Sequence, residues 1–254
     1  MIRRTVLAAA ALVLCGACAA TPTQRPPAAT AAVPSATASR CPNPDGGPSN
    51  HCLGALTAGT YSTQAFQPQL RYTVPDGWSN LEDLPGQVLL LPPGATLEGV
   101  NPGTSDIVGI YASIAAPLKD CSSTPDPVVG ATVGAYVHWL ETNPQLDVSR
   151  PSAVTVGGLT GTMIDVALRP EATGTCSDAA MNLDRFAEVA IGQYPSNFSA
   201  SVLPTLDLRL ELFDVQERVL AVLIADALDG GSAYDDFNAA AQLVIDSFEF
   251  DASH

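Results

Sequence analysis

Two neighbouring stretches near the C-terminus decide the fold: LDLRLEL at residues 206–212 and VLAVLIA at residues 219–225. The first alternates leucine with charged residues, a pattern typical of an antiparallel strand with one buried face. The second is apolar throughout, which favours a central position in a sheet. Residues 214–217 lie between the two stretches and predict the turn that joins them.

Further strands are predicted upstream from short runs of β-branched, aromatic and aliphatic residues. They cover residues 59–61, 70–74, 88–91, 107–114, 154–156, 162–168 and 186–191. The glycines of GGLTG at residues 157–161 separate two of these strands, and glycine suits the positive φ angles of a hairpin turn. A phosphate-binding loop needs a helix after its glycines, so the strand-like run that follows favours the hairpin.

Two helices are predicted. The first begins at Asp126-Pro127, where aspartate caps free amides and proline fits the first turn, and it ends at Pro144. The second begins at a pair resembling a capping box, Ser232 with Asp235. The expected buried stripes are Val129, Val133, Tyr136, Val137 and Leu140 in the first helix, and Phe237, Ala241, Val244 and Phe248 in the second.

The whole pattern gives about nine strands and two main helices, with hairpin connections and few parallel crossovers. It predicts the α+β class: a mainly antiparallel β-sheet covered by two main helices. No internal repeat is visible, so residues 41–254 are expected to form a single globular domain.

The N-terminus has the layout of an export signal, because Arg3 and Arg4 precede an apolar run at residues 6–14. A helix that spans a bilayer needs roughly 20 apolar residues, so this run is too short, and no later run is long enough. The domain is therefore expected on the extracytoplasmic side of the membrane.

The end of this signal resembles a bacterial lipobox, with Gly16-Ala17 before Cys18. The resemblance implies removal of residues 1–17 as a signal peptide and attachment of a diacylglycerol to the Cys18 thiol. Cys15 stands where the pattern usually has leucine. Two alternatives therefore stay open: lipidation of Cys15, and ordinary secretion after cleavage within the alanines that follow.

Residues 18–40 are rich in alanine, proline and threonine and show no hydrophobic periodicity. Such a segment buries too little apolar surface to offset the entropy lost on ordering. We expect a disordered stalk that lifts the domain from the membrane.

Four cysteines follow the signal, Cys41, Cys52, Cys121 and Cys176. An even number in an exported chain predicts two disulfides, with three possible connectivities. Pairing Cys41 with Cys52 is favoured because they flank a loop rich in proline and glycine. Pairing Cys121 with Cys176 is favoured because they flank a predicted helix and two strands. No paired cysteine or histidine spacing indicates a metal site.

The formal net charge is −15, and hydrophobic residues make up 46% of the chain. So acidic a chain is repelled by phosphate backbones, which excludes nucleic acid as a partner. The apolar fraction is ample for a core, so the acidity belongs to the surface of a folded domain.

The domain is similar to the PsbP-like family over residues 60–250. The motifs are VPDGW at residues 74–78, the GGLTG hairpin, and IDSF at residues 245–248. The same arrangement occurs in actinobacterial lipoproteins. The resemblance implies a PsbP-like α/β sandwich that serves in assembly, docking or binding, and it transfers no catalytic residue.

Candidate catalytic residues are few. His138 lies on the first predicted helix, but the Gly-x-Ser-x-Gly motif of many serine hydrolases is absent, so a solvated helix histidine is favoured. Acidic residues near Gly230-Gly231 suggest carboxylate chemistry or a hard cation, although acids are also common at a helix start. These acids are Asp226, Asp229, Asp235 and Asp236. Five aromatics are candidates for a ligand groove, with core packing favoured: Tyr61, Tyr72, Trp78, Tyr194 and Phe198.

We therefore expect a membrane-anchored extracytoplasmic lipoprotein that binds a protein or small molecule of unknown identity, without a catalytic residue, cofactor or metal. Two alternatives stay open. One is a hydrolase that uses the carboxylates between Asp226 and Asp236. The other is a lipid or glycolipid carrier, which needs a large apolar cavity between sheet and helices.

Overall fold

The structure, a computed structural model, describes residues 53–95, 105–179, 182–192, 198–227 and 233–251, all within the Ala36–His254 unit of the chain. Among these residues, no helix combines the length and apolar character needed to cross a membrane. Several predictions fall outside the described residues. They concern the signal peptide at 1–17, Cys18, the stalk at 18–40, Cys41, Cys52, and the side chains of Tyr194, Asp229, Ser232 and Asp235.

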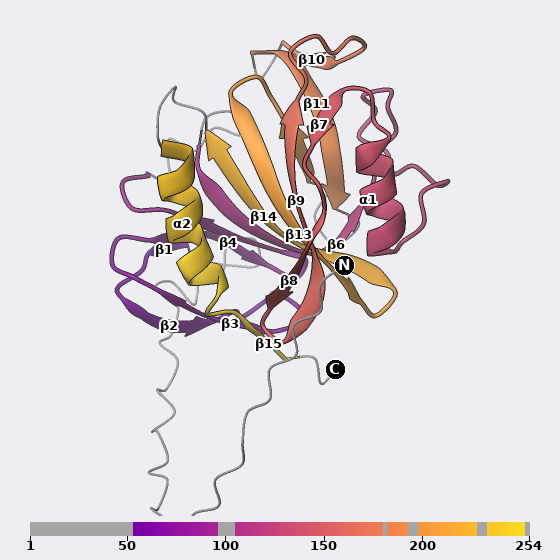
Figure 1. Cartoon of the computed structure of the whole chain (residues 1–254). Helices are drawn as coiled ribbons and strands as arrows, with labels where there is room; N and C mark the ends of the chain where they lie inside the picture. Colours follow the sequence, from indigo (N-terminus) through magenta and orange to yellow (C-terminus); the bar gives the residue numbers. More distant parts are fainter. Residues whose placement is uncertain (1–52, 96–104, 180–181, 193–197, 228–232, 252–254) are drawn as a thin grey trace, which may run out of the picture. The chain divides into compact units, whose positions relative to one another are not determined.

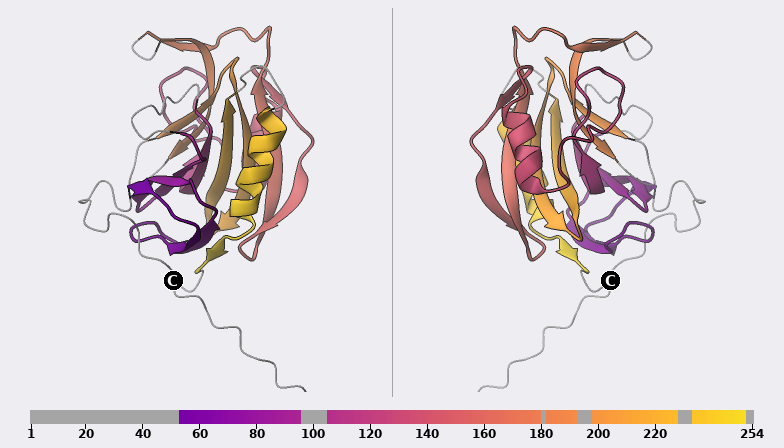
Figure 2. Two further views of the ribbon diagram at one scale, coloured as in Figure 1. Left: turned by 90° about the vertical axis from the view of Figure 1, so that its left-hand side faces the viewer. Right: turned by 90° about the vertical axis from the view of Figure 1, so that its right-hand side faces the viewer.

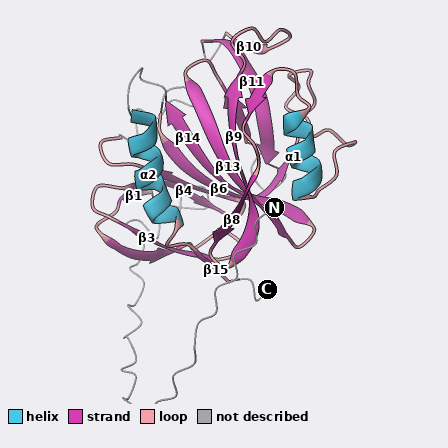
Figure 3. Ribbon diagram, viewed as in Figure 1, coloured by secondary structure: helices cyan, strands magenta, loops and turns pink. Residues whose placement is uncertain are grey.

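Strands dominate the described part of the chain, which has two helices, α1 (Val133–Glu141) and α2 (Ala233–Ile245) (Figures 1 and 3). The strands, in chain order, are β1 (Gly54–Ala55), β2 (Gly59–Ser62), β3 (Leu70–Val74), β4 (Ser79–Leu84), β5 (Gln87–Leu91), β6 (Ile107–Ala115), β7 (Leu146–Val148), β8 (Ser152–Val156), β9 (Leu159–Leu168), β10 (Cys176–Asp178), β11 (Leu183–Gly192), β12 (Ser199–Val202), β13 (Leu206–Val215), β14 (Arg218–Ala227) and β15 (Glu249–Phe250).

Twelve of these strands form one sheet with the order β1-β4-β5-β6-β14-β13-β9-β7. β8 pairs with β9, and β11 connects β10 and β12 to the end of β6. A separate three-stranded sheet has the order β15-β3-β2. Because β14 lies between β6 and β13, the central position predicted from its apolar run is confirmed.

The prediction of a mainly antiparallel sheet with two helices is confirmed, but the α+β label fits only coarsely because strands predominate. Many of the strands that the sequence did not predict are short or polar. On β4, Asn80 and Asp83 are fully buried, and the Asp83 carboxylate accepts the backbone N–H groups of Gln64 and Phe66 at 2.5 and 3.0 Å. A strand with buried polar residues lacks the hydrophobic alternation that sequence reasoning detects.

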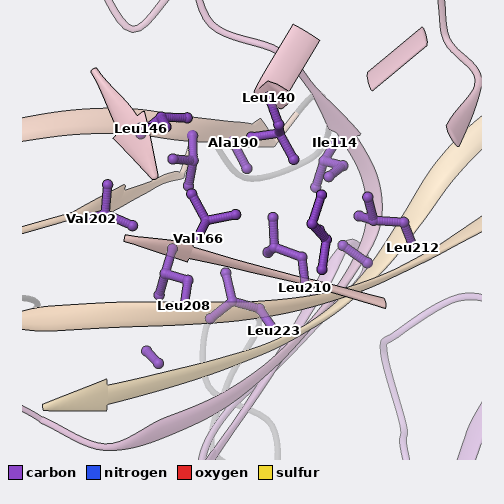
Figure 4. Close-up of a cluster of buried hydrophobic side chains, with 14 of the residues drawn as sticks. Ile114, Leu140, Leu146, Val166, Ala190, Val202, Leu208, Leu210, Leu212 and Leu223 are labelled. Carbon is purple, nitrogen blue, oxygen red and sulfur yellow. The ribbon is translucent and has the colours of Figure 1, made fainter. Parts of the chain in front are cut away.

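One face of the large sheet forms a core that α1 covers, which we call the α1 face (Figures 2 and 4). Its side chains are nearly all aliphatic and come from β6, β9, β11, β13 and β14. Figure 4 shows three leucines of LDLRLEL gathered with Val166 of β9 and Leu140 of α1, namely Leu208, Leu210 and Leu212. The buried face predicted for this stretch is therefore confirmed.

The opposite face, which we call the α2 face, is covered by α2 and the three-stranded sheet. Phe213 of β13 packs there with Leu220 and Val222 of β14. The prediction that β13 is half-buried is correct for Arg209 but wrong for Glu211, which is fully buried. Phe213, one residue beyond the predicted stretch, is fully buried on the same face. The reason is that α2 and the small sheet cover the second face as well.

Helix α1 begins later than predicted. Thr132 is its N-cap, and the Asp126 carboxylate instead accepts the N–H of Val128 at 3.0 Å, which turns the chain before the helix. A further cap comes from the β13–β14 hairpin, where Asp214 Oδ1 accepts the N–H of Val133 at 2.8 Å. The signal at Asp126 therefore marks a turn of the chain, and the helix begins at a later capping residue, Thr132, whose hydroxyl oxygen accepts the N–H of Ala135 at 3.3 Å.

The buried stripe predicted for α1 is correct for Val133, Tyr136 and Leu140 and wrong for Val129, which precedes α1 and is only partly buried, as is Val137.

Two other local predictions are confirmed. Phe237, Ala241, Val244 and Phe248 are all buried in or just after α2. The β8–β9 hairpin turns at two glycines, Gly157 with φ of 56° and Gly158 with φ of 82°. The strand that follows them rules out the phosphate-loop arrangement.

Cys121 and Cys176 form a disulfide that closes a separation of 55 residues. It joins the loop before α1 to β10. One of the two predicted pairs is therefore present, and the other lies outside the described residues.

Candidate ligand-binding cleft

A cavity of about 540 Å³ lies where the end of β6 meets the loop before α1 and the tip of the β13–β14 hairpin. We call it the cleft. Its lining combines apolar side chains with a few charged ones, as ligand sites of this size do. The lining residues are Ser113, Ile114, Ala115, Ala116, Pro125, Asp126, Pro127, Val129, Gly130, Ala131, Tyr136, Glu217, Arg218 and Val219.

A bulge in β6 shapes the floor of the cleft. The pairing of β6 with β14 shifts register between Val219 and Ala221, so that β6 carries one residue more than β14 at this point. Bulges redirect the side chains that follow them. Here the bulge includes Ser113, whose side chain lines the cleft although it is 7% exposed.

Tyr136 of α1 forms the inner wall. Its hydroxyl donates a hydrogen bond to the backbone oxygen of Val189 on β11. Burial raises the pKa of Tyr136 well above its ordinary value, so the phenol stays protonated. The hydroxyl therefore fixes α1 against β11 and is not available as a catalytic acid.

The outer wall is the loop at residues 117–131. The backbone N–H of Asp126 donates to Ala116 O at 2.8 Å, which joins the loop to the end of β6. Next to the cleft, Val128 is 89% exposed. An exposed valine costs little by itself, but beside an apolar cleft it extends the surface available to a ligand.

Side chains and the disulfide hold this loop in place. The Ser123 hydroxyl donates to Glu188 on β11. The Lys119 ammonium lies 6.0 Å from the centre of the Trp139 ring on α1, within range of a cation–π contact. With the disulfide at Cys121, three attachments fix the outer wall before any ligand is bound.

The mouth of the cleft carries charges of both signs. Glu217 and Arg218 at the tip of the β13–β14 hairpin line it from one side, and Asp126 lines it from the other. The hairpin turns at Gln216 and Glu217, which have φ of 49° and 63°. Successive non-glycine residues in the left-handed region are uncommon and occur more often at functional sites.

The predicted carboxylates lie elsewhere. Asp226 is 1% exposed, and its carboxylate accepts a hydrogen bond from the Asn238 amide at 3.1 Å. Asp236 is exposed on α2. Among the described residues, no group of three or more His, Cys, Asp or Glu side chains is placed to hold a metal ion.

His138 is exposed on α1, which agrees with the solvated helix histidine favoured from the sequence. Tyr61, Tyr72 and Trp78 are at most 3% exposed and pack in the core of the α2 face, as favoured. Phe198 stacks on Tyr111 with ring centres 3.8 Å apart. These aromatics therefore do not line a groove.

Sequence reasoning missed one chemically unusual group, Glu211, which is fully buried on the α2 face. Neither of its carboxylate oxygens has a hydrogen-bond partner among the described residues. Burial is the main cause that raises the pKa of Glu211 to about 7, and Asp246 acts in the same direction. Gln242 and Arg209 lie close enough to oppose this rise. In the sequence, Glu211 occupies a polar position of an alternating strand, and that pattern predicts an exposed face. Nothing in the sequence indicated that α2 covers this face.

Sequence reasoning also missed the cleft. Its lining comes from segments 113–116, 125–131 and 217–219 and from Tyr136, which carry no shared motif. The pairing of β6 with β14, the Asp214 cap and the bond from Asp126 N–H to Ala116 O bring these segments together.

No protein-family model and no curated protein matches the chain. A crystal structure from Bacteroides thetaiotaomicron is similar at 13% identity with a TM-score of 0.32, covering 71% of this chain. The chain spans only 44% of that protein. The solution structure of cyanobacterial PsbP (CyanoP) from Synechocystis sp. PCC 6803 is similar at 10% identity with a TM-score of 0.34, covering 80% of this chain and 99% of that one. The architecture given above follows from the strand pairing and not from these likenesses.

Proposed function

We propose that the protein is an extracytoplasmic binding module, tethered to the membrane by a lipid on Cys18, and that the cleft is its ligand-binding site. The observation that carries this proposal is the cleft itself, a cavity of about 540 Å³ whose lining combines apolar side chains with polar and charged ones. The apolar side chains supply binding energy, and the few charged groups orient the ligand.

The chemistry of the lining favours binding over catalysis. Its inner hydroxyl, that of Tyr136, is already used in a hydrogen bond. Asp126 and Glu217 also belong to the lining, but they lie on opposite sides of it, one in the loop before α1 and the other at the tip of the β13–β14 hairpin. Neither histidine nor cysteine belongs to the lining that the structure describes, so the serine–histidine and cysteine–histidine pairs of nucleophilic catalysis are missing from it.

The walls of the cleft are also held in place before a ligand binds. The outer wall is held by the disulfide, and α1 is held at its first turn by Asp214. A site that is rigid before binding loses less conformational entropy when the ligand arrives. The resemblance to the PsbP-like family, whose members serve in assembly, docking or binding, supports the same function.

The two alternatives receive less support. The hydrolase needs carboxylates that reach a substrate, whereas Asp226 is buried and hydrogen-bonded to Asn238. The lipid carrier needs an apolar cavity between sheet and helices. In the described residues, buried side chains form a core between the sheet and the helix on each face.

The site is tested by placing a photoreactive benzoylphenylalanine at Val128 in the full chain and irradiating the cells. Leu243 on α2, which is 69% exposed, is the matched control position away from the cleft. We expect one adduct of defined mass from Val128 and none from Leu243. Equal adducts at both positions, or none at Val128, would contradict the assignment of the cleft.

The tether is tested separately by labelling cells with palmitate. We expect the label to be lost in Cys18→Ala and kept in Cys15→Ala. The reverse result would move the lipid to Cys15, and label in neither wild type nor variants would indicate ordinary secretion.

A further inference from the structure

β8 is the longest strand at any edge of the two sheets in the described part of the chain. It pairs with β9 on one side and with no other described strand. Ser152, Ala153 and Thr155 are exposed, and the strand contains neither charge nor proline. Natural proteins usually protect an edge with charges, proline, a bulge or short length, and β8 shows none of these devices within its five residues.

The register of the β8–β9 hairpin determines which backbone groups of β8 are unused. Val156 faces Leu159 across a two-residue turn, so this closing pair exchanges hydrogen bonds, and every second pair after it does the same. The backbone N–H and C=O groups of Val154 therefore form hydrogen bonds with β9. The N–H and C=O groups of Ala153 and Thr155 point the other way, out of the sheet edge.

We propose that β8 is a self-association edge, through which two copies of this chain pair antiparallel about a twofold axis at Val154. This pairing sets Ala153 opposite Thr155 of the partner subunit, and the symmetry repeats the pair. Each of these pairs exchanges two bonds, so about four new backbone hydrogen bonds form. Moving the axis by one residue in either direction shifts the register by two residues and leaves only one complete pair, because Pro151 has no N–H and Gly157 lies in the turn.

Charge favours a second copy as the occupant. The paired strands bring no like charges together, although the chain as a whole carries −15. The register also places exposed Arg150 opposite Gly158 of the partner subunit. The hairpin tip lies against β15, since a Cβ added at Gly157 would come within 2.7 Å of Phe250. Phe250 is flanked by two exposed acids, Asp251 and Glu249, and the latter lies 3.7 Å from Arg71 of the same chain. Arg150 of each copy therefore adds a cation near the acidic residues beside the hairpin tip of the other.

This inference goes beyond the proposed function and does not depend on it, because no residue of β8 lines the cleft. It is tested on the full-length exported protein in detergent, with Val154→Cys and Ala153→Cys as a matched pair. Val154 meets itself across the axis in a non-hydrogen-bonded pair, with Cα atoms about 4.5 Å apart. Two copies of Ala153 are diagonal neighbours about 7–8 Å apart, too far for an unstrained disulfide.

We expect V154C to form a disulfide-linked dimer under mild oxidation and A153C to do so at least about tenfold more slowly. Sedimentation of the wild type should show a dimer that is lost in the double variant Ala153→Lys with Thr155→Lys, which places like charges opposite each other. Both positions are exposed, so the monomer fold should be kept. A wild-type monomer throughout about 1–100 μM, or a dimer that survives the lysine variant, would overturn the proposal.

Discussion

The two faces of the large sheet are built from the same strands but differ in chemistry. The α1 face is almost wholly apolar, is held by the disulfide, and leads into the cleft. The α2 face buries Glu211, and also Asp226 with its partner Asn238, beneath α2. We infer a division of roles from this difference. The α1 face supplies the rigid wall of the proposed binding site, and the stability of the α2 face is expected to depend on pH.

The largest effect is expected on the α2 face from Gly161→Ala. A Cβ there would lie 2.1 Å from Leu212 O and 2.6 Å from the Phe213 ring. Because the backbone of β13 cannot move away cheaply, we expect a loss of more than about 4 kcal/mol in the free energy of unfolding.

Chemical denaturation measures this loss. Gly158→Ala is the control, because nothing lies within 4 Å of its added Cβ and only the positive φ of 82° opposes alanine. It should cost about 1 kcal/mol. Equal losses in the two variants would show that Phe213 does not pack on β9 in this way.

A somewhat smaller effect is expected on the α1 face from the double variant Cys121→Ser with Cys176→Ser. Loop-closure entropy for a separation of 55 residues corresponds to about 4 kcal/mol of stability. The same variant should weaken the Val128 adduct, since the outer wall of the cleft loses an attachment. A stability change below about 1 kcal/mol, with an unchanged adduct, would show that the disulfide does not support this face.

Glu211→Gln tests whether the α2 face responds to pH. The pKa of this carboxyl is 4.5 in its ordinary state and about 7 when folded. Between these values only the folded state holds the proton, so stability falls as pH rises from 4.5 to about 7 and then stays level for this group. The loss over this interval is about 3 kcal/mol.

We therefore expect the wild type to lose stability over this range and Glu211→Gln to lose much less, as measured by denaturation at pH 4.5, 6 and 8. Glu249→Gln is the control, because the Glu249 side chain is 70% exposed. Its profile should follow that of the wild type. The same slope in all three proteins would refute the assignment of the slope to Glu211.

The smallest effect is expected from the cap of α1. Asp214→Ala removes the acceptor for the N–H of Val133 and should cost about 1 kcal/mol. Asp214→Asn keeps an acceptor oxygen and should recover most of that loss. If asparagine is as damaging as alanine, the charge of Asp214 at the helix end matters more than its hydrogen bond.

The sequence predicted what depends on local pattern and missed what depends on distant contacts. The stretch LDLRLEL and the apolar run after it were correctly predicted as paired strands. The reason is that the spacing of apolar residues along a strand follows directly from which positions face the core. The predicted start of α1 was wrong because Asp126 turns the chain and Thr132 is the N-cap. The further cap from Asp214, 81 residues away from Val133, has no local signal. Glu211 and the cleft were missed because they too depend on residues that are distant in the sequence.

The central claim, that the cleft binds the ligand, is tested most directly by filling it. A Cβ on Gly130 would meet only Ala135 at 3.5 Å, and one on Gly134 would meet nothing within 4 Å, so both sites accept a side chain. Gly130 lines the cleft, whereas Gly134 does not. We expect Gly130→Trp to abolish the photoadduct formed from Val128 and Gly134→Trp to leave it unchanged. An adduct that persists in Gly130→Trp would contradict the account.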